Sequence, residues 1–119
     1  MSAYVAIANR PWNRTTIDAS GNLSLNMGNR QLRQFLASAN IAAPKTWALS
    51  NTNNSFEFRF RFTIAGGLHV QTMPANFDMA DPLWDPVGKT WTPLDLGDYE
   101  AHGKYNGTTW YVTIIGLYD

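Results

Sequence analysis

Ten consecutive residues, Ser55 to Ile64, constrain the fold of this chain more than any other stretch of its sequence. Every second position is apolar, and these positions are Phe56, Phe58, Phe60, Phe62 and Ile64. The positions between them carry polar side chains, namely Glu57, Arg59, Arg61 and Thr63. A period of two is that of a β-strand, in which successive side chains point to opposite faces. The pattern predicts an antiparallel strand with its phenylalanines in the core and its other face in solvent.

The C-terminal segment, from Gly97 to Gly116, predicts a β-hairpin. Its centre is Asn106-Gly107, a dipeptide that reaches positive φ easily at both positions and so favours a two-residue hairpin loop. In the second arm, polar or outward positions alternate with the apolar residues Trp110, Val112 and Ile114. We therefore expect this hairpin to close a sheet, with those three side chains in the core.

Shorter alternating runs predict further strands at Tyr4 to Ile7, Asn22 to Met27 and Thr46 to Ser50. The turn residues Ala65-Gly66-Gly67 are followed by Leu68 to Met73, which we expect to return as the hairpin partner of the phenylalanine strand. Pro74 to Pro93 is rich in prolines and predicts a long loop.

One segment has a different period and predicts a helix. Its apolar residues are spaced at i, i+3, i+4 and i+7, and they are Leu32, Phe35, Leu36 and Ala39. Asn29 precedes the segment as a candidate N-cap, and Pro44 closes it. The spacing predicts one amphipathic helix across about residues 30–40.

These elements predict a single domain over residues 1–119, mainly β, as an antiparallel β-sandwich or partly open barrel with one short α-helix. A chain of 119 residues is long enough to bury a core of its own. It has no cysteine, so neither a disulfide framework nor a thiolate metal site is expected. The N-terminus has no basic segment followed by a long apolar run, which predicts no secretory signal. The apolar runs are also far shorter than the ~20 residues of a membrane-spanning helix.

Charge is unusually sparse. Only 15% of the residues are charged, against about 25% in ordinary globular domains, while 13% are aromatic and the formal net charge is zero. A surface built from neutral polar and aromatic groups favours contact with partners, because interface cores are depleted in Lys, Glu and Asp. The alternative is an ordinary β-domain kept in solution by neutral polar groups. The absence of a basic excess argues against nucleic-acid binding.

Groups for acid–base or nucleophilic chemistry are few. The glutamates are Glu57, which alternates with arginines and is expected to form ion pairs, and Glu100, expected to be a solvated strand residue. The histidines are His69 and His102, and neither lies near a nucleophile-elbow motif. We therefore expect no catalytic residues, no cofactor and no enzymatic activity.

Aspartates are concentrated in and around the long loop, at Asp78, Asp81, Asp85, Asp95 and Asp98. Oxygen ligands of this kind suit Ca²⁺, although the spacing matches no EF-hand. The alternative is that these residues cap turns, because three of them adjoin proline or glycine. The second interpretation is the one we expect, with no metal bound.

Two pairs of side chains are candidates for contact with a partner or ligand. Trp84 and Trp91 are flanked by polar and turn residues and offer flat faces for sugar rings, or else they are buried beside the long loop. Arg59 and Arg61 project from the same face of the phenylalanine strand and can meet an acidic partner, the alternative being a solvated face.

The second half of the chain resembles β-rich modules of tailed-phage virions. Lys89 to Pro93, Gly97 to Glu100 and Tyr105 to Val112 are similar to the ends of modules in tail fibres, spikes and capsid decoration proteins. In those modules a strand ending in Tyr-(Asp/Asn)-Gly-Thr-X-Trp closes a small sandwich. Leu68 to Phe77 also resembles a strand that runs into a Pro-X-Asn turn there. The resemblance covers roughly residues 56–119 and leaves out the predicted helix.

This resemblance implies a non-enzymatic virion structural protein, a capsid decoration or tail component made in the host cytoplasm. It implies other virion proteins as partners and a symmetric homo-oligomer, with a trimer as the first expectation. Neither nucleic acid nor a membrane is an expected partner. The alternative function is a carbohydrate-binding, lectin-like β-module with a glycan ligand.

Overall fold

The computed structural model describes residues 12–18, 21–37 and 40–117, which form eleven strands and no helix. The strands are β1 (Asn13–Ile17), β2 (Asn22–Asn26), β3 (Leu32–Ala37), β4 (Lys45–Ser50), β5 (Glu57–Ile64), β6 (Gln71–Thr72), β7 (Phe77–Met79), β8 (Trp84–Asp85), β9 (Thr90–Trp91), β10 (Gly97–Tyr105) and β11 (Trp110–Gly116). Within these residues there is no helix with the length and apolarity needed to cross a membrane.

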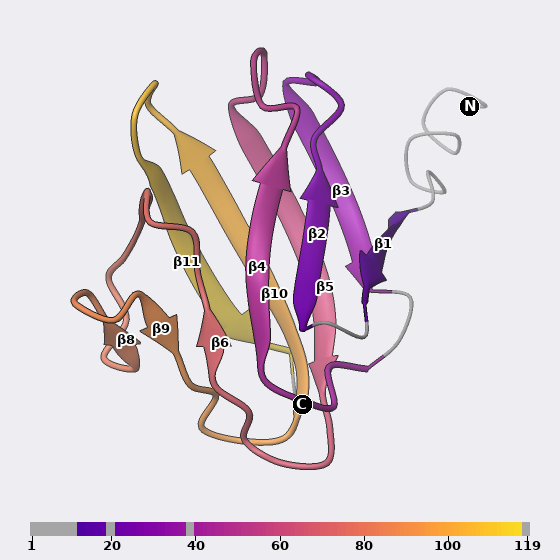
Figure 1. The fold of residues 1–119 in the computed structure, drawn as a ribbon, viewed down its shortest axis with the longest axis vertical. Coiled ribbons are helices and arrows are strands. Elements are labelled where there is room, and N and C mark those ends of the chain that lie inside the picture. The colour runs from indigo at the N-terminus through magenta and orange to yellow at the C-terminus, as the bar shows by residue number, and fades with distance from the viewer. Residues whose placement is uncertain (1–11, 19–20, 38–39, 118–119) are drawn as a thin grey trace.

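All eleven strands belong to one sheet that folds back on itself into a nearly closed, barrel-like structure (Figure 1). Their hydrogen-bonded order is β7-β11-β10-β5-β3-β1-β2-β4-β6-β9-β8. The first five strands in this order form what we call layer A, and the last five form layer B. Between them β1 pairs with β3 on one side and β2 on the other. The prediction of a mainly β fold is confirmed.

From β2 to β6 the chain alternates between the two layers (Figure 1). As a result, β1, β3 and β5 are parallel neighbours, and so are β2, β4 and β6. The phenylalanine strand β5 is therefore antiparallel only on its β10 side. The predicted hairpin between β5 and Leu68 to Met73 is wrong, since β6 pairs with β4 and β9 in layer B. With β3 and β10 bound to its two edges, β5 has no edge free for β6.

The core lies between the layers and is largely aromatic. Phe58, Phe60 and Phe62 are buried on the inner face of β5, as predicted. Trp47 of β4 meets Phe60 and Phe62 edge-on, with ring centroids 5.0 and 5.4 Å apart, and so ties layer B to layer A. Phe56 is instead 55% exposed, and its predicted place in the core is wrong. The strand begins only at Glu57, so Phe56 lies just beyond the ladder.

The predicted helix at residues 30–40 is also wrong, because this segment contains strand β3. Hydrogen bonding to β1 on one side and β5 on the other outweighs the local helical spacing. Phe35 then faces the core while Leu32 is exposed on the opposite face. Asn29 has a φ of 58° in the preceding turn and caps no helix. Position 39 and the predicted strand at 4–7 lie outside the described residues.

The closing hairpin is confirmed, with a longer loop than predicted. Tyr105 pairs with Trp110 at its end, so the loop has four residues, 106–109, in place of two. The Asn106 carboxamide explains the extra length, because its Oδ1 accepts hydrogen bonds from the amides of Thr108 and Thr109. Gly107 has a φ of 106°, as its place in the turn requires.

The segment between Pro74 and Pro93, predicted as one loop, contains the short strands β7, β8 and β9. β7 runs parallel to β11 at one end of the sheet, and β9 joins β8 to β6 at the other. Long-range pairing thus orders a segment whose prolines and turn residues suggested no strand.

Candidate functional site

The outer face of layer A brings together the most concentrated polar chemistry among the described residues. Strand alternation turns Arg59 and Arg61 outward from β5, as predicted. The register of β5 with β10 then sets Arg59 opposite His102 and Arg61 opposite Glu100. We call these four residues the Glu100 cluster. The sequence predicted the two arginines but not their partners, since only the pairing of strands about forty residues apart creates the group.

Glu100 is the centre of the cluster, with two hydrogen-bond donors and a third, more distant guanidinium group around its carboxylate. Its Oε2 lies 3.1 Å from Nε of Arg61, and its Oε1 lies 2.6 Å from Nε2 of His102. Nε of Arg59 is 3.7 Å from the same Oε1. A carboxylate can only accept, so His102 Nε2 carries the proton of this bond. Glu100 is not the solvated residue that the sequence predicted, because its side chain is only 8% exposed.

The surroundings of Glu100 keep it ionised. Burial alone raises the pKa of this carboxyl group, but the hydrogen bonds from His102 and Arg61, together with their charges, outweigh burial and lower the pKa. A folded-state pKa below the unfolded one means that ionised Glu100 stabilises the fold at neutral pH. That contribution is lost as the pH falls through the folded-state pKa.

We predict that Glu100→Gln destabilises the protein by about 1–3 kcal/mol at pH 7, since it removes charged hydrogen bonds at a buried position. The difference from the parent protein should shrink at acid pH, as the pH falls through the lowered folded-state pKa and the carboxyl group takes up a proton. Urea unfolding at pH 7 and pH 3 measures both values. Glu57→Gln, on the outer face of β5, is the control and should change stability little at either pH. An equal loss at both pH values for Glu100→Gln would contradict the assignment.

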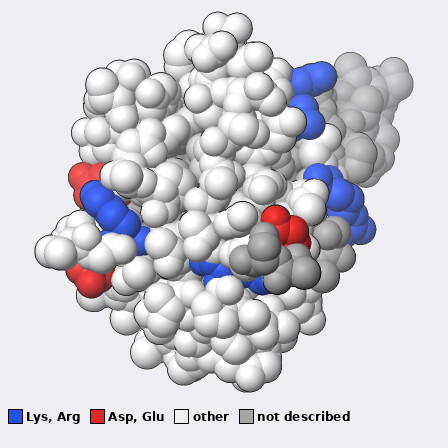
Figure 2. Space-filling view, in the orientation of Figure 1, with Lys and Arg blue, Asp and Glu red and all other residues white. Residues whose placement is uncertain are grey.

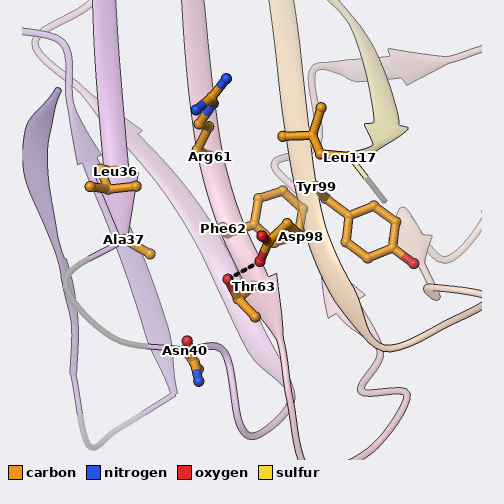
Figure 3. Close-up of a pocket in the computed structure, with 9 residues that line it drawn as sticks. All are labelled: Leu36, Ala37, Asn40, Arg61, Phe62, Thr63, Asp98, Tyr99 and Leu117. Carbon is orange, nitrogen blue, oxygen red and sulfur yellow. Dashed lines mark hydrogen bonds between the residues drawn. The ribbon is translucent and has the colours of Figure 1, made fainter. Parts of the chain in front are cut away.

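Two hollows flank the Glu100 cluster on this face. The first, of about 190 Å³, lies where β3 and β5 end and β10 begins, with Arg61, Thr63 and Asp98 on its polar side (Figure 3). Thr63 Oγ1 donates to Asp98 Oδ1 at 2.6 Å there. The second, of about 400 Å³, is lined by His102 and by Tyr111 of β11, among others. Each hollow thus borders a residue that binds Glu100.

Trp12 adds an aromatic group whose position beside the cluster could not be predicted from sequence. Its ring lies 5.4 Å from Cζ of Arg61, within the range of a cation–π contact. The two residues are 49 positions apart, and Trp12 precedes β1, so no periodic pattern connects them. The Arg61 guanidinium group therefore contacts both the Glu100 carboxylate and the Trp12 ring.

The predicted contact residues Trp84 and Trp91 are buried, with 9% and 1% of their surfaces exposed. Trp91 meets Tyr99 edge-on at 5.3 Å in the core. Lys89 Nζ lies 5.7 Å from the ring of Trp84. The structure thus agrees with the alternative that both rings fill the core beside the long segment. Neither presents a free face on which a sugar ring can stack.

The aspartates of the long segment act in turns. Asp81 Oδ1 accepts from the amide of Leu83 at 2.8 Å, and Asp85 Oδ1 accepts from the amide of Val87 at 2.9 Å. Asp98 is engaged by Thr63 on the outer face of layer A. The part of the chain that the structure describes brings no three His, Asp or Glu side chains together in a way that suits a metal ion.

The outer face of layer B contrasts with that of layer A, because it carries almost no charge. Figure 2 shows this face toward the viewer: its upper and central part is free of charged side chains, which appear along both sides and across the lower middle. Its strands expose small neutral side chains, which are Asn22, Ser24 and Asn26 of β2 and Thr46, Ala48 and Ser50 of β4. We call these six residues the neutral face. Each strand shows the pattern in sequence, but their adjacency depends on the parallel β2–β4 pairing.

Comparison of the chain with protein-family models, with curated proteins and with solved structures finds no match.

Proposed function

We propose that this protein is a non-enzymatic assembly module that binds copies of itself and other proteins, as a capsid decoration or tail component of a virion. The observation that carries the proposal is the neutral face. Burying charged side chains in an interface requires desolvating them, which is costly, whereas small hydroxyl, amide and methyl groups are buried at little cost. Small side chains also let a second surface approach the strands closely.

Exposed apolar residues at one end of layer B support the same proposal. Leu68 and Val70 precede β6, while Leu94 and Leu96 follow β9, and all four are exposed. Because β6 and β9 are antiparallel, these two segments leave the ladder at the same end. Apolar side chains exposed together are typical of contact surfaces.

Symmetry completes the proposal. A virion module acts through many repeated contacts, so a modest interface gives firm attachment when several copies bind together. A homotrimer remains the first expectation, and it follows from the resemblance to phage modules. Other virion proteins are the proposed partners.

The test is to place a charge at the centre of the neutral face. Ala48 lies directly opposite Ser24 in the β2–β4 register, so Ala48→Glu would bury an unpaired carboxylate in any interface formed there. We predict that the parent protein is oligomeric at micromolar concentration in light scattering and that Ala48→Glu shifts it to monomers. Thr113→Glu adds the same charge to an exposed strand position of layer A and should leave the oligomer intact.

In a pull-down, the parent protein and Thr113→Glu should bind phage particles, and Ala48→Glu should lose this binding. A protein that is monomeric and binds no particle would contradict the proposal. A glycan array then tests the carbohydrate-binding alternative, which now depends on Tyr111, a 51% exposed ring beside the second hollow. Glycan binding that Tyr111→Ala abolishes would favour that function.

A further inference from the structure

The two layers leave an opening between the N-terminal part of β3 and the C-terminal part of β2, which β1 does not bridge. This strand pairs with β3 at residues 13–15 and with β2 at residues 16–17, so it ends before the far halves of β2 and β3. A pocket of about 480 Å³ fills the gap, and we call it the seam pocket. Its polar side chains are Arg14, Thr15, Thr16, Ser24, Asn26, Arg33 and Ser50. Phe35 closes its inner side.

Arg33 is the unusual residue of this pocket. It stands on the same side of β3 as the buried Phe35, and its backbone position is opposite the buried Phe58 of β5. Its Nε is buried and has no hydrogen-bond partner. A guanidinium group keeps its charge in proteins, and a buried N–H without an acceptor destabilises the fold. This geometry requires an acceptor that the pocket residues do not supply.

The charge of the pocket is also uncompensated. Arg59 and Arg61 share Glu100, whereas none of the described residues that line the seam pocket is an aspartate or a glutamate. Arg14 donates only a long hydrogen bond, from its Nη1 to the Ala37 carbonyl at 3.5 Å. Two arginines therefore face a polar cavity in which hydroxyl and amide groups supply further donors.

We propose that the seam pocket binds an oxyanion, held by the Arg33 guanidinium and completed by Arg14 and the nearby hydroxyl groups. Arginine recognises carboxylate, phosphate and sulfate through paired N–H donors, and such charge-assisted hydrogen bonds are the strong ones. The volume is within the range of small-molecule sites, so the oxyanion is either a free inorganic ion or the acidic group of a compact molecule such as a sugar acid. The pocket shares Ser24, Asn26 and Ser50 with the neutral face, whereas its two arginines lie outside that face.

Calorimetric titration at constant ionic strength, with chloride as the balancing ion, tests this site. The probes are inorganic phosphate, sulfate and glucuronate, with glucose as the uncharged counterpart of glucuronate. We expect saturable binding of at least one anion and none of glucose. Binding of glucuronate alone would identify a sugar acid as the ligand class, while binding of phosphate or sulfate would identify a general oxyanion site.

Arg33→Gln should weaken this binding by about tenfold or more, because it removes the charged donor. Arg30→Gln removes the same charge from the exposed turn just before β3 and should bind like the parent protein. In anion-free buffer Arg33→Gln should melt no lower than the parent, since the unpaired N–H is gone. Added anion should raise the melting temperatures of the parent and of Arg30→Gln, but not that of Arg33→Gln. Absence of saturable binding at millimolar anion, or an equal loss in both variants, would overturn the proposal.

Discussion

Replacing Phe58 with alanine is expected to lower the free energy of unfolding by about 3–5 kcal/mol. The side chain is fully buried, with its ring centroid 5.3 Å from that of Trp110 and 6.1 Å from that of Phe77. Truncation therefore removes buried apolar area and leaves a cavity that rigid aromatic neighbours cannot fill. A loss of this size is a large part of the stability of a domain, typically about 5–15 kcal/mol.

Chemical denaturation followed by tryptophan fluorescence measures the change. Phe56→Ala is a closely matched control, because it deletes the same side chain two positions earlier, where the ring is 55% exposed. It should change stability by less than about 1 kcal/mol. Equal effects of the two variants would mean that the inner face of β5 is assigned wrongly.

Gly103→Ala is expected to be nearly as damaging although it adds one methyl group. Gly103 pairs with Phe58 across β10 and β5, and the Phe58 ring covers it. A Cβ at position 103 would lie 2.1 Å from Cε2 of that ring, far inside van der Waals contact. Because the ring is enclosed on all sides it cannot move away freely, so we expect a loss of about 3 kcal/mol or more, at or above the upper end for overpacking.

A double-mutant cycle separates this clash from any general intolerance of alanine in β10. Phe58→Ala removes the atoms that the new methyl group would strike, so Gly103→Ala should be far less harmful in that background. We expect the double variant to be more stable than the sum of the single losses predicts, by about 1–3 kcal/mol. Strict additivity of the two losses would contradict the proposed contact.

The elements that could be predicted from sequence are those specified by local alternation. In β5 and β11 the inner and outer faces differ so strongly that period two is unmistakable, and the described parts of both strands follow it. The helix predicted from Leu32, Phe35 and Leu36 is wrong because a strand with apolar residues on both faces can have the same spacing as an amphipathic helix. The partner strand of β6 cannot be predicted from local sequence for another reason. Both edges of β5 are paired with other strands, so β6 joins the layer in which an edge is free.

The candidate sites show the same division. Arg59 and Arg61 were found because they share a face of one strand, whereas Glu100 looked like any exposed strand residue until β10 was set beside β5. Arg33 gave no signal, because its inward position follows from the strand that replaced the predicted helix. Residues that share a face of one strand can be identified from sequence alone. Sites formed by several strands can be identified only when the pairing register of those strands is known.

The alternation of the chain between two layers also bears on how the protein folds. Among the described strands, consecutive elements from β2 to β6 lie in opposite layers, so their ladders join segments separated by an intervening strand. Closing these larger loops loses chain entropy before any pairing compensates for it, which slows folding. The β10–β11 hairpin is the long ladder between adjacent segments and can form first. We therefore expect β5 to add to β10 next and the other strands of layer A to follow toward β1.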